Sequence, residues 1–326
     1  MKKILHSITT FCLFSVLSGT LLSLGCSKQE EPYEHPFTVL DDVDSSPVSG
    51  DEDGRASIEE AGWSTPLKLP VDDDGAEDST YITRDGRYVL FYHVPTWGGG
   101  NGIDPQIYFS ERPFVSRQVH PITSEGFNAE AGPYISEAGD IYYARTFIVL
   151  DSGEAYQERP IGIVTNDGTE ILDMGTGFIE GNPHYCDAMD ELYANIEYES
   201  GDTDIAVFKD GNTTFLPEPI NLPEKLELQP FLTDDCQTMY FTSSRGATTG
   251  NFPLQIYKSE RLGEFDWSEP ELFISHPQPE GISGGVGEFS MTRDGKQMVF
   301  LELTITPDGD DFVGTNKMYY AEKTEQ

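Results

Sequence analysis

The feature that most constrains the fold is a motif that recurs five times along the 326 residues of the chain. Each copy consists of a short apolar strand, a polar turn and a second strand rich in aromatic residues. Two of the turns read Arg-Asp-Gly, and Asp followed by Gly is typical of tight hairpins. The residue that opens the turn returns at intervals of roughly 50 residues, as Thr83, Ser136, Cys186, Thr233 and Thr292.

Each unit continues beyond this hairpin. A third strand follows in every copy, for example at 106–113 and 255–262, and most copies carry a fourth, clearest at 267–274. Four antiparallel strands in about 50 residues are typical of a propeller blade. The sequence therefore predicts an all-β, five-bladed β-propeller over residues 61–326, with blades that start near residues 77, 130, 180, 227 and 287.

The order of the strands indicates how the ring closes. The fifth unit ends at Gln326 without a fourth strand, and a stretch before the first unit, 63–69, matches 267–273 at Trp, Ser and Pro. We expect 63–69 to complete the last blade, because closure removes the open edges of the sheets. The alternative is a stray strand beside an incomplete sixth blade.

The units resemble the repeats of TolB-like and WD-repeat-like β-propeller proteins, in which a turn with Asp-Gly precedes an aromatic strand and a later strand ends in Ile-Tyr. The resemblance covers residues 63–326 and implies the propeller fold, but it implies no particular activity. The TolB propeller has six blades, whereas this chain has five units. The residues that carry the resemblance are 83–91 with 106–108, 133–143, 183–193, 230–241 with 255–257, and 292–300 with 317–319.

The amino terminus has the pattern of an export signal. Lys2 and Lys3 precede an apolar stretch, and residues 1–25 are typical of a secretory signal peptide. The end of this stretch resembles the lipobox of bacterial lipoproteins, which implies that Cys26 is lipidated. Residues 26–60 are acidic and poor in large apolar side chains, which predicts a disordered tether. We therefore expect a lipid anchor in the cell envelope, at the outer membrane facing the periplasm or the exterior.

The charge of the chain excludes some partners. Asp and Glu number 57 against 20 Lys and Arg, for a net charge of −37. Nucleic acid is excluded as a partner because phosphate binding needs a basic surface. Attachment to the membrane is expected only through the lipid, since a strongly acidic protein is not attracted to anionic lipid.

A register of glutamates marks one rim of the predicted propeller. Four units carry a glutamate six residues before the turn-opening residue, and the fifth has one two places later: Glu77, Glu130, Glu180, Glu227 and Glu288. Carboxylates close to the axis repel one another unless a cation, a raised pKa or neighbouring donors compensate. One interpretation is that the first four glutamates bind Ca²⁺ or another cation, or that the rim is the entrance for a cationic ligand. The other is that each glutamate bonds backbone amides of the next blade. No other cofactor is expected.

The same rim is expected to carry the loop 95–105, where Trp97 and Asp104 lie in a Gly-rich stretch. An exposed tryptophan in such a loop is a stacking platform for a sugar or a peptide. The alternative is that Trp97 folds back over the rim.

A catalytic interpretation comes from a second resemblance. Asp78 and the Glu180-Gly181-Asn182-Pro183 stretch are similar to the acids of five-bladed arabinanases and β-xylosidases, which implies glycoside hydrolysis by Asp78 and Glu180. The stretch that begins at Glu180 has one residue inserted relative to the Glu-Gly-Pro motif of that family, and the second blade lacks the aspartate that the family has there. We find no Gly-x-Ser-x-Gly, P-loop or metal-spaced histidines.

Two cysteines remain beyond the amino terminus, Cys186 and Cys236, in the first turns of neighbouring blades. A disulfide between them and a pair of buried thiols are both compatible with the sequence.

The hypothesis that the sequence favours is a non-enzymatic module that binds an envelope protein or peptide, or serves as a scaffold. The alternative is a glycan-binding protein or glycoside hydrolase.

Overall fold

The computed structural model describes residues 42–71, 76–94, 106–120, 129–151, 154–158, 161–165, 168–248, 252–277, 283–308 and 311–324. These residues form strands and turns and contain no helix, so the predicted all-β class is confirmed for this part of the chain. Within it, no helix is long and apolar enough to span a membrane. The chain divides into two compact units, Met1–Glu31 and Pro32–Gln326, and the first lies outside the described residues.

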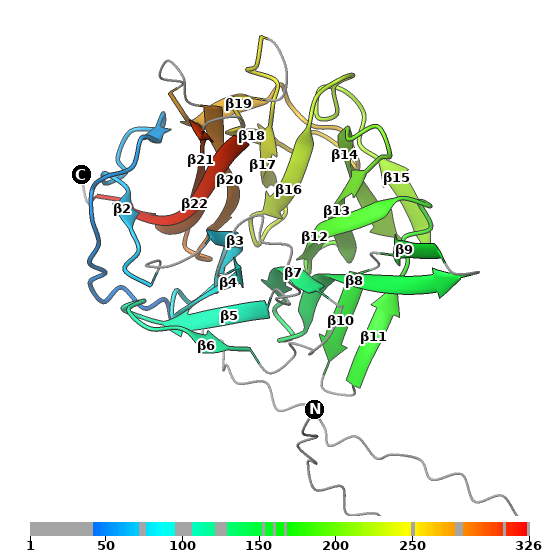
Figure 1. Cartoon of the computed structure of the whole chain (residues 1–326), viewed down its shortest axis with the longest axis horizontal. Coiled ribbons are helices and arrows are strands. Elements are labelled where there is room, and N and C mark those ends of the chain that lie inside the picture. Colours follow the sequence, from blue (N-terminus) through cyan, green and yellow to red (C-terminus); the bar gives the residue numbers. More distant parts are fainter. Residues whose placement is uncertain are drawn as a thin grey trace, which may run out of the picture. The chain divides into compact units, whose positions relative to one another are not determined.

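The first three repeats each form one antiparallel sheet (Figure 1). From the innermost strand outward, the first sheet consists of β3 (Ala76–Ile82), β4 (Tyr88–Val94), β5 (Gln106–Glu111) and β6 (Gln118–Val119). The second consists of β7 (Ala129–Ile135), β8 (Ile141–Asp151), β10 (Ile161–Thr165) and β11 (Gly168–Leu172), and an additional strand, β9 (Glu154–Glu158), pairs with the carboxyl-terminal half of β8. The third consists of β12 (Ile179–Cys186), β13 (Glu191–Glu197), β14 (Thr203–Lys209) and β15 (Asn212–Phe215).

The last two repeats each recruit a strand from before the first repeat. These two sheets contain β16 (Glu227–Leu232), β17 (Thr238–Ser243), β18 (Gln255–Glu260) and β19 (Glu271–Ser275), with β1 (Ser57–Ile58); and β20 (Ser283–Met291), β21 (Gln297–Asp308) and β22 (Asp311–Glu322), with β2 (Leu67–Lys68).

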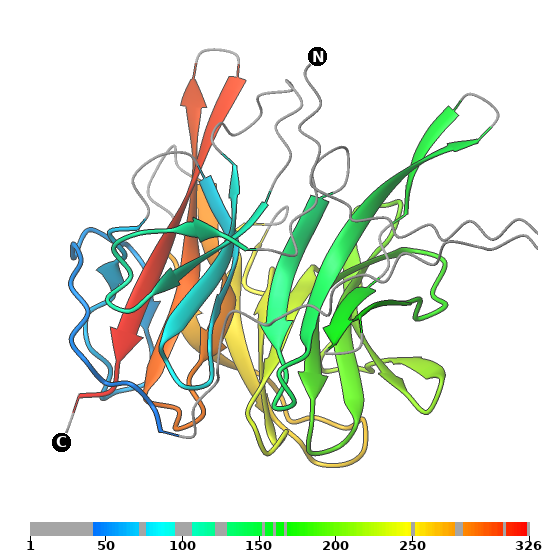
Figure 2. The same ribbon diagram turned by 90° about the horizontal axis from the view of Figure 1, so that it is seen from below.

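The innermost strands of the sheets contact one another in a cycle. β3 contacts β7, β7 contacts β12, β12 contacts β16, β16 contacts β20, and β20 returns to β3. Figure 1 shows these strands gathered around one axis with the outer strands splayed away from it. Figure 2 shows that the β8–β9 and β21–β22 hairpins extend past the other strands on the same side. This is a propeller arrangement.

The predicted pairing of the amino-terminal strand is present. Leu67 and Lys68 pair with Tyr320 and Tyr319 of the last strand, and Trp63 forms a bridge with Lys323. The strand that precedes the first sheet therefore completes the last one.

The boundary expected for the disordered tether differs from the structure. The expected tether ran to residue 60, but the described part of it, from residue 42 onward, bonds to the sheets. Ser57 and Ile58 pair with β19, and the backbone amides of Arg55 and Ala56 donate to Glu302 at 2.7 and 3.0 Å. The physical reason is that a few spaced apolar side chains here, among them Ile58, pack against the core although the segment is acidic overall.

Both faces of the central strands are covered by neighbouring sheets. β13 is buried along nearly its whole length, because one face packs on each adjacent sheet. The turns that follow the inner strands are fixed by side chains: Thr83, Thr233 and Thr292 each donate a hydroxyl hydrogen bond of 2.6–2.7 Å to an aspartate two residues later. In these three units the turns therefore hold the ends of the inner strands in the same position.

Candidate functional site

A repeated distortion of the inner strands builds a ring of side chains around the axis. In each sheet, the pairing of the inner strand with its neighbour shifts by a β-bulge at the same place in the repeat. The residue four places before the turn-opening residue lies in this bulge and has positive φ in all five units. These bulge residues are Ser79 (φ 55°), Gly132 (61°), Asn182 (46°), Gln229 (55°) and Glu288 (54°).

The bulge residues meet at one small cavity. All five line a space of about 40 Å³, together with the two residues that follow each of them. This volume accommodates a few water molecules, and it is far below the ~300 Å³ of a typical small-molecule pocket. A non-glycine residue at positive φ costs about 1–3 kcal/mol, and such residues cluster at functional sites. Four of them around one cavity mark the axis as the candidate site.

Glu288 is the centre of the polar network in this ring, with 8% of its surface exposed. The Asn182 side-chain amide donates to Glu288 Oε2 at 2.9 Å, and the Gln229 side-chain amide donates to Oε1. Gln229 in turn accepts from the backbone amide of Glu288 at 3.0 Å and from the Thr242 hydroxyl at 2.7 Å. The carboxylate is therefore oriented by side chains from two other sheets, the third and the fourth.

A second carboxyl group completes the network. Asp78 forms a side-chain hydrogen bond with Glu288 and accepts from the backbone amide of Ser79 at 2.8 Å. Burial raises the pKa of Asp78, and burial together with Asp78 raises the pKa of Glu288 well above its ordinary value. The raised pKa values and the hydrogen bond between the two carboxyl groups favour a proton shared by the pair.

The opposite end of the axis is filled by Arg84, from the turn of the first sheet. Its guanidinium lies 2.6 Å from Asp234 Oδ1, 3.2 Å from Asp187 Oδ2 and 3.3 Å from Glu137 Oε1, each from the turn of a different sheet. It also donates to the hydroxyl of Tyr134. This charged cluster, which we call the Arg84 cluster, closes the end of the axis where the inner strands finish.

The glutamates predicted from the sequence occupy separate places. Glu77 is buried with its Oε1 2.9 Å from His93 Nδ1. Glu180 accepts from the backbone amide of Met174 at 3.0 Å and from the Thr176 hydroxyl at 3.2 Å. The segment 173–176 precedes the glutamate's own strand, so this carboxylate ties the link between two sheets to the inner strand.

Glu227 has an equivalent place in the next sheet. It accepts from the Ser243 hydroxyl at 2.9 Å and from the backbone amide of Leu222 at 3.3 Å, and Arg245 lies 3.5 Å away. Burial raises the pKa values of Glu180 and Glu227 to about 7. Each glutamate is thus bonded within its own sheet and the link before it.

The remaining predicted positions are distributed as follows. The backbone of Glu130 lies in β7 opposite Arg145, and its side chain is outside the described part of the chain. Trp97, Asp104 and the lipidation site Cys26 lie outside the described residues as well. Among the residues that the structure describes, no three His, Cys, Asp or Glu side chains gather in a way that could hold a metal ion.

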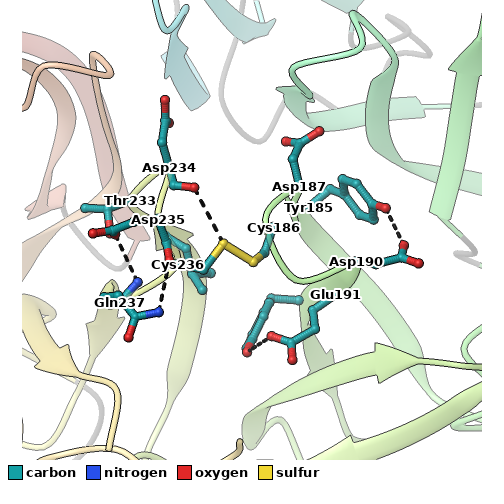
Figure 3. Close-up of a disulfide and its surroundings, with 12 residues drawn as sticks. Tyr185, Cys186, Asp187, Asp190, Glu191, Thr233, Asp234, Asp235, Cys236 and Gln237 are labelled. Atoms are coloured by element: carbon teal, nitrogen blue, oxygen red, sulfur yellow. Dashed lines mark hydrogen bonds between the residues drawn. A yellow bond between two sulfur atoms is a disulfide. The ribbon is translucent and has the colours of Figure 1, made fainter.

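Cys186 and Cys236 form a disulfide, with their Cα atoms 6.0 Å apart (Figure 3). The bond joins the inner turns of two neighbouring sheets. Asp187 follows the first cysteine and Asp234 precedes the second by two residues, so the disulfide lies beside two ligands of Arg84.

Sequence reasoning missed the bulge residues because they share conformation rather than chemistry. The available signal was a dipeptide: Gly132, Asn182 and Gln229 each precede a proline at the same point of the repeat. Glu288 was included in the predicted rim, but as the displaced member of the glutamate register.

No protein-family model matches the chain, and no curated protein matches its sequence. Similar solved structures include TolB from Acinetobacter baumannii, at 14% identity and a TM-score of 0.42 over 77% of this chain and 55% of that one. A putative TolB from Agrobacterium tumefaciens gives 14% identity and 0.44 over 77% and 91%. The family-43 endo-arabinanase from Bacillus licheniformis gives 12% identity and 0.44 over 77% and 96%. The chain thus spans about half the length of the first of these proteins, and similarity at this level concerns the fold and not the activity.

Proposed function

We propose that the chain is a lipid-anchored binding module of the cell envelope, in which the five sheets are the blades of one closed propeller. Its partner is a protein or peptide that docks on the mouth face, by which we mean the face where β3, β7, β12, β16 and β20 begin. Cys26 carries the lipid, and the anchor places the module at the outer membrane.

The observation that carries this proposal is the difference between the two ends of the axis. One end is closed by the Arg84 cluster, whereas the other leads to the paired carboxyl groups of Asp78 and Glu288. The cavity beside Glu288, at about 40 Å³, is too small for a sugar or a metabolite. A macromolecule that covers the mouth face fits this geometry better than a small ligand that enters it. The net charge of −37 favours a partner with a basic contact surface.

Site-directed photo-crosslinking tests the chosen face. A photoreactive amino acid at Ser200, in the exposed turn between β13 and β14, lies on the mouth face. The matched control is Ala138, in the exposed turn between β7 and β8 at the opposite end. In intact cells we expect a discrete protein adduct from Ser200 and none from Ala138. Identical adducts at both positions, or none at Ser200, would contradict the proposal.

The lipid anchor has its own test. The variant Cys26→Ala should move from the membrane fraction to the soluble envelope fraction and should lose incorporation of radiolabelled palmitate. An unchanged membrane association of this variant would show that another element holds the protein there.

One observation favours the glycoside hydrolase as a second candidate. Burial raises the pKa of Glu180 to about 7, which is the range that a general acid needs. Against it, the Glu180 carboxylate is engaged by Met174 and Thr176, and Asp78 bonds with Glu288. We expect no turnover of arabinan, xylan or their oligosaccharides. Turnover by the wild type that is lost in Glu180→Gln would support the glycoside hydrolase and contradict the binding module.

A further inference from the structure

Three aromatic side chains from separate segments of the third sheet meet at the mouth face. Phe178 directly precedes β12, Tyr198 directly follows β13, and Phe215 ends β15. The rings of Phe178 and Tyr198 are 4.8 Å apart and nearly perpendicular, and those of Tyr198 and Phe215 are 6.3 Å apart and nearly parallel. We call these three residues the aromatic patch.

The patch is exposed. Phe178 has 45% and Phe215 has 39% of its surface in contact with solvent, and they are the two phenylalanines among the exposed large apolar side chains of the described residues. Aromatic rings gathered on a surface mark interaction sites more often than apolar residues scattered singly.

The rings are held in place before any partner binds. The Tyr198 hydroxyl donates to Asp204 Oδ2 at 2.7 Å, and burial and this aspartate raise the pKa of Tyr198, so the phenol stays neutral. The backbone amide of Phe178 donates to the Thr176 hydroxyl at 3.2 Å. Thr176 also bonds Glu180, so the buried glutamate fixes the segment that presents Phe178. Rigid aromatic side chains bind with little loss of conformational entropy.

The charge around the patch selects the kind of partner. No Lys or Arg occurs from Pro160 to Phe208, and acidic residues flank Tyr198 on both sides, at Glu197 and Glu199. The negative faces of aromatic rings attract guanidinium and ammonium groups, and neighbouring carboxylates strengthen that attraction. A neutral sugar would gain nothing from this charge.

We propose that the aromatic patch is the docking point for an arginine-bearing segment of the protein partner. This inference rests on the proposed function and deepens it, because it names the chemistry of the contact. The guanidinium groups lie over Phe178 and Phe215, and Tyr198 forms the wall between them. The surrounding acids orient the segment.

A peptide titration tests the patch with the full chain in detergent micelles. The probe is fluorescently labelled tetra-arginine at an ionic strength of about 0.15 M, where long-range attraction is screened. The double variant Phe178→Ala/Phe215→Ala keeps the net charge, so it separates aromatic contact from general attraction to an acidic protein. We expect it to bind at least about tenfold more weakly than the wild type. Val119→Ala, which alters an apolar residue that is 46% exposed on β6, should bind as the wild type does.

Three results would overturn the patch: equal binding by the double variant and the wild type, no binding by the wild type, or binding of xylan or arabinan oligosaccharides in place of the peptide. Both substituted residues are exposed, so an unchanged melting temperature of the double variant verifies that it is folded.

The crosslink at Ser200 separates this inference from the proposed function. An adduct that forms in the wild type and persists in the double variant supports the binding module and contradicts the aromatic patch as its docking point. An adduct lost only in the double variant supports both. If the wild type forms no adduct, the proposed function fails, and the peptide titration still decides whether the patch binds arginine.

Discussion

Replacing Arg84 with alanine should destabilise the protein more than the replacement of any other buried charged residue in the inner turns. The side chain comes from the first sheet, and its guanidinium contacts acids from the turns of the next three sheets. Arg84→Ala removes the cation and leaves Asp187, Asp234 and Glu137 facing one another around the axis. The free energy of unfolding therefore measures whether the sheets converge there.

The magnitude follows from burial. Removing one partner of a buried ion pair costs about 3–5 kcal/mol, because the other charge is left without compensation. The Arg84 side chain is 6% exposed, but Asp234 is 31% and Glu137 is 55% exposed, so water screens part of the loss. We expect a decrease of about 2–4 kcal/mol at pH 7. As the pH falls, Asp187, whose pKa is raised by burial, takes up a proton, its ion pair with Arg84 weakens and the deficit of the variant should shrink.

Urea denaturation followed by tryptophan fluorescence measures this difference, with Arg87→Ala as the control. Arg87 belongs to the same turn but has an exposed pair with Glu111 at 3.5 Å, which predicts a loss of about 0–1 kcal/mol. If the two variants unfold at the same urea concentration with equal slopes, the guanidinium of Arg84 does not hold the turns together. A deficit in Arg84→Ala that stays constant down to pH 4 would contradict the electrostatic explanation.

Other substitutions address the remaining features of the axis. Asp78→Asn should raise stability by about 1–2 kcal/mol at pH 8 and leave it unchanged below about pH 4, because the raised carboxyl pKa values make the wild type lose stability as the pH rises through them; melting temperatures across this range check it. Gly132→Ala places a Cβ 3.0 Å from a backbone atom at φ +61° and should cost about 2–4 kcal/mol, whereas Gly139→Ala, with open space at φ +88°, should cost about 1 kcal/mol in the same urea assay. Removing the disulfide by replacing Cys186 and Cys236 with alanine frees a loop of 50 residues and should cost about 4 kcal/mol; equal stability of wild type and variant under non-reducing conditions would refute this.

The hairpins and the closing strand could be predicted because their determinants are local or repeated. Alternating apolar residues and Asp-containing turns identify each inner pair of strands, and five copies allow each unit to be checked against the others. The Trp63 segment could be assigned because it matches a fourth strand elsewhere in the chain. The extent of the domain could not be predicted in the same way: residues 55–58 look like acidic linker, and they join the fold through backbone amides that bond to Glu302 and β19.

The candidate site was harder to predict for a related physical reason. The glutamate register is conspicuous in sequence, yet Glu180 and Glu227 use their carboxylates to bind the links before their own strands. The bulge residues differ in chemistry, from Gly132 to Glu288, and share only a backbone conformation with positive φ, which the type of the residue does not predict. In this chain the glutamate register has a structural role repeated between units, whereas the polar network at the axis forms where the backbone conformation repeats and the side chain changes.

This principle explains why the two ends of the axis have different chemistry. The mouth end is lined by one equivalent position from every unit, and the closed end by equivalent turn residues of the first four units. One side chain dominates each end: Arg84 from the first unit at the closed end and Glu288 from the last unit at the mouth. The first and last units are neighbours, because β20 contacts β3 and the bulge residue Glu288 bonds with Asp78. The strand Leu67–Lys68 holds the last unit closed on the side away from the axis. The contact between units one and five therefore links the cation that seals one end to the carboxyl pair at the other, and loosening the closing strand should perturb both.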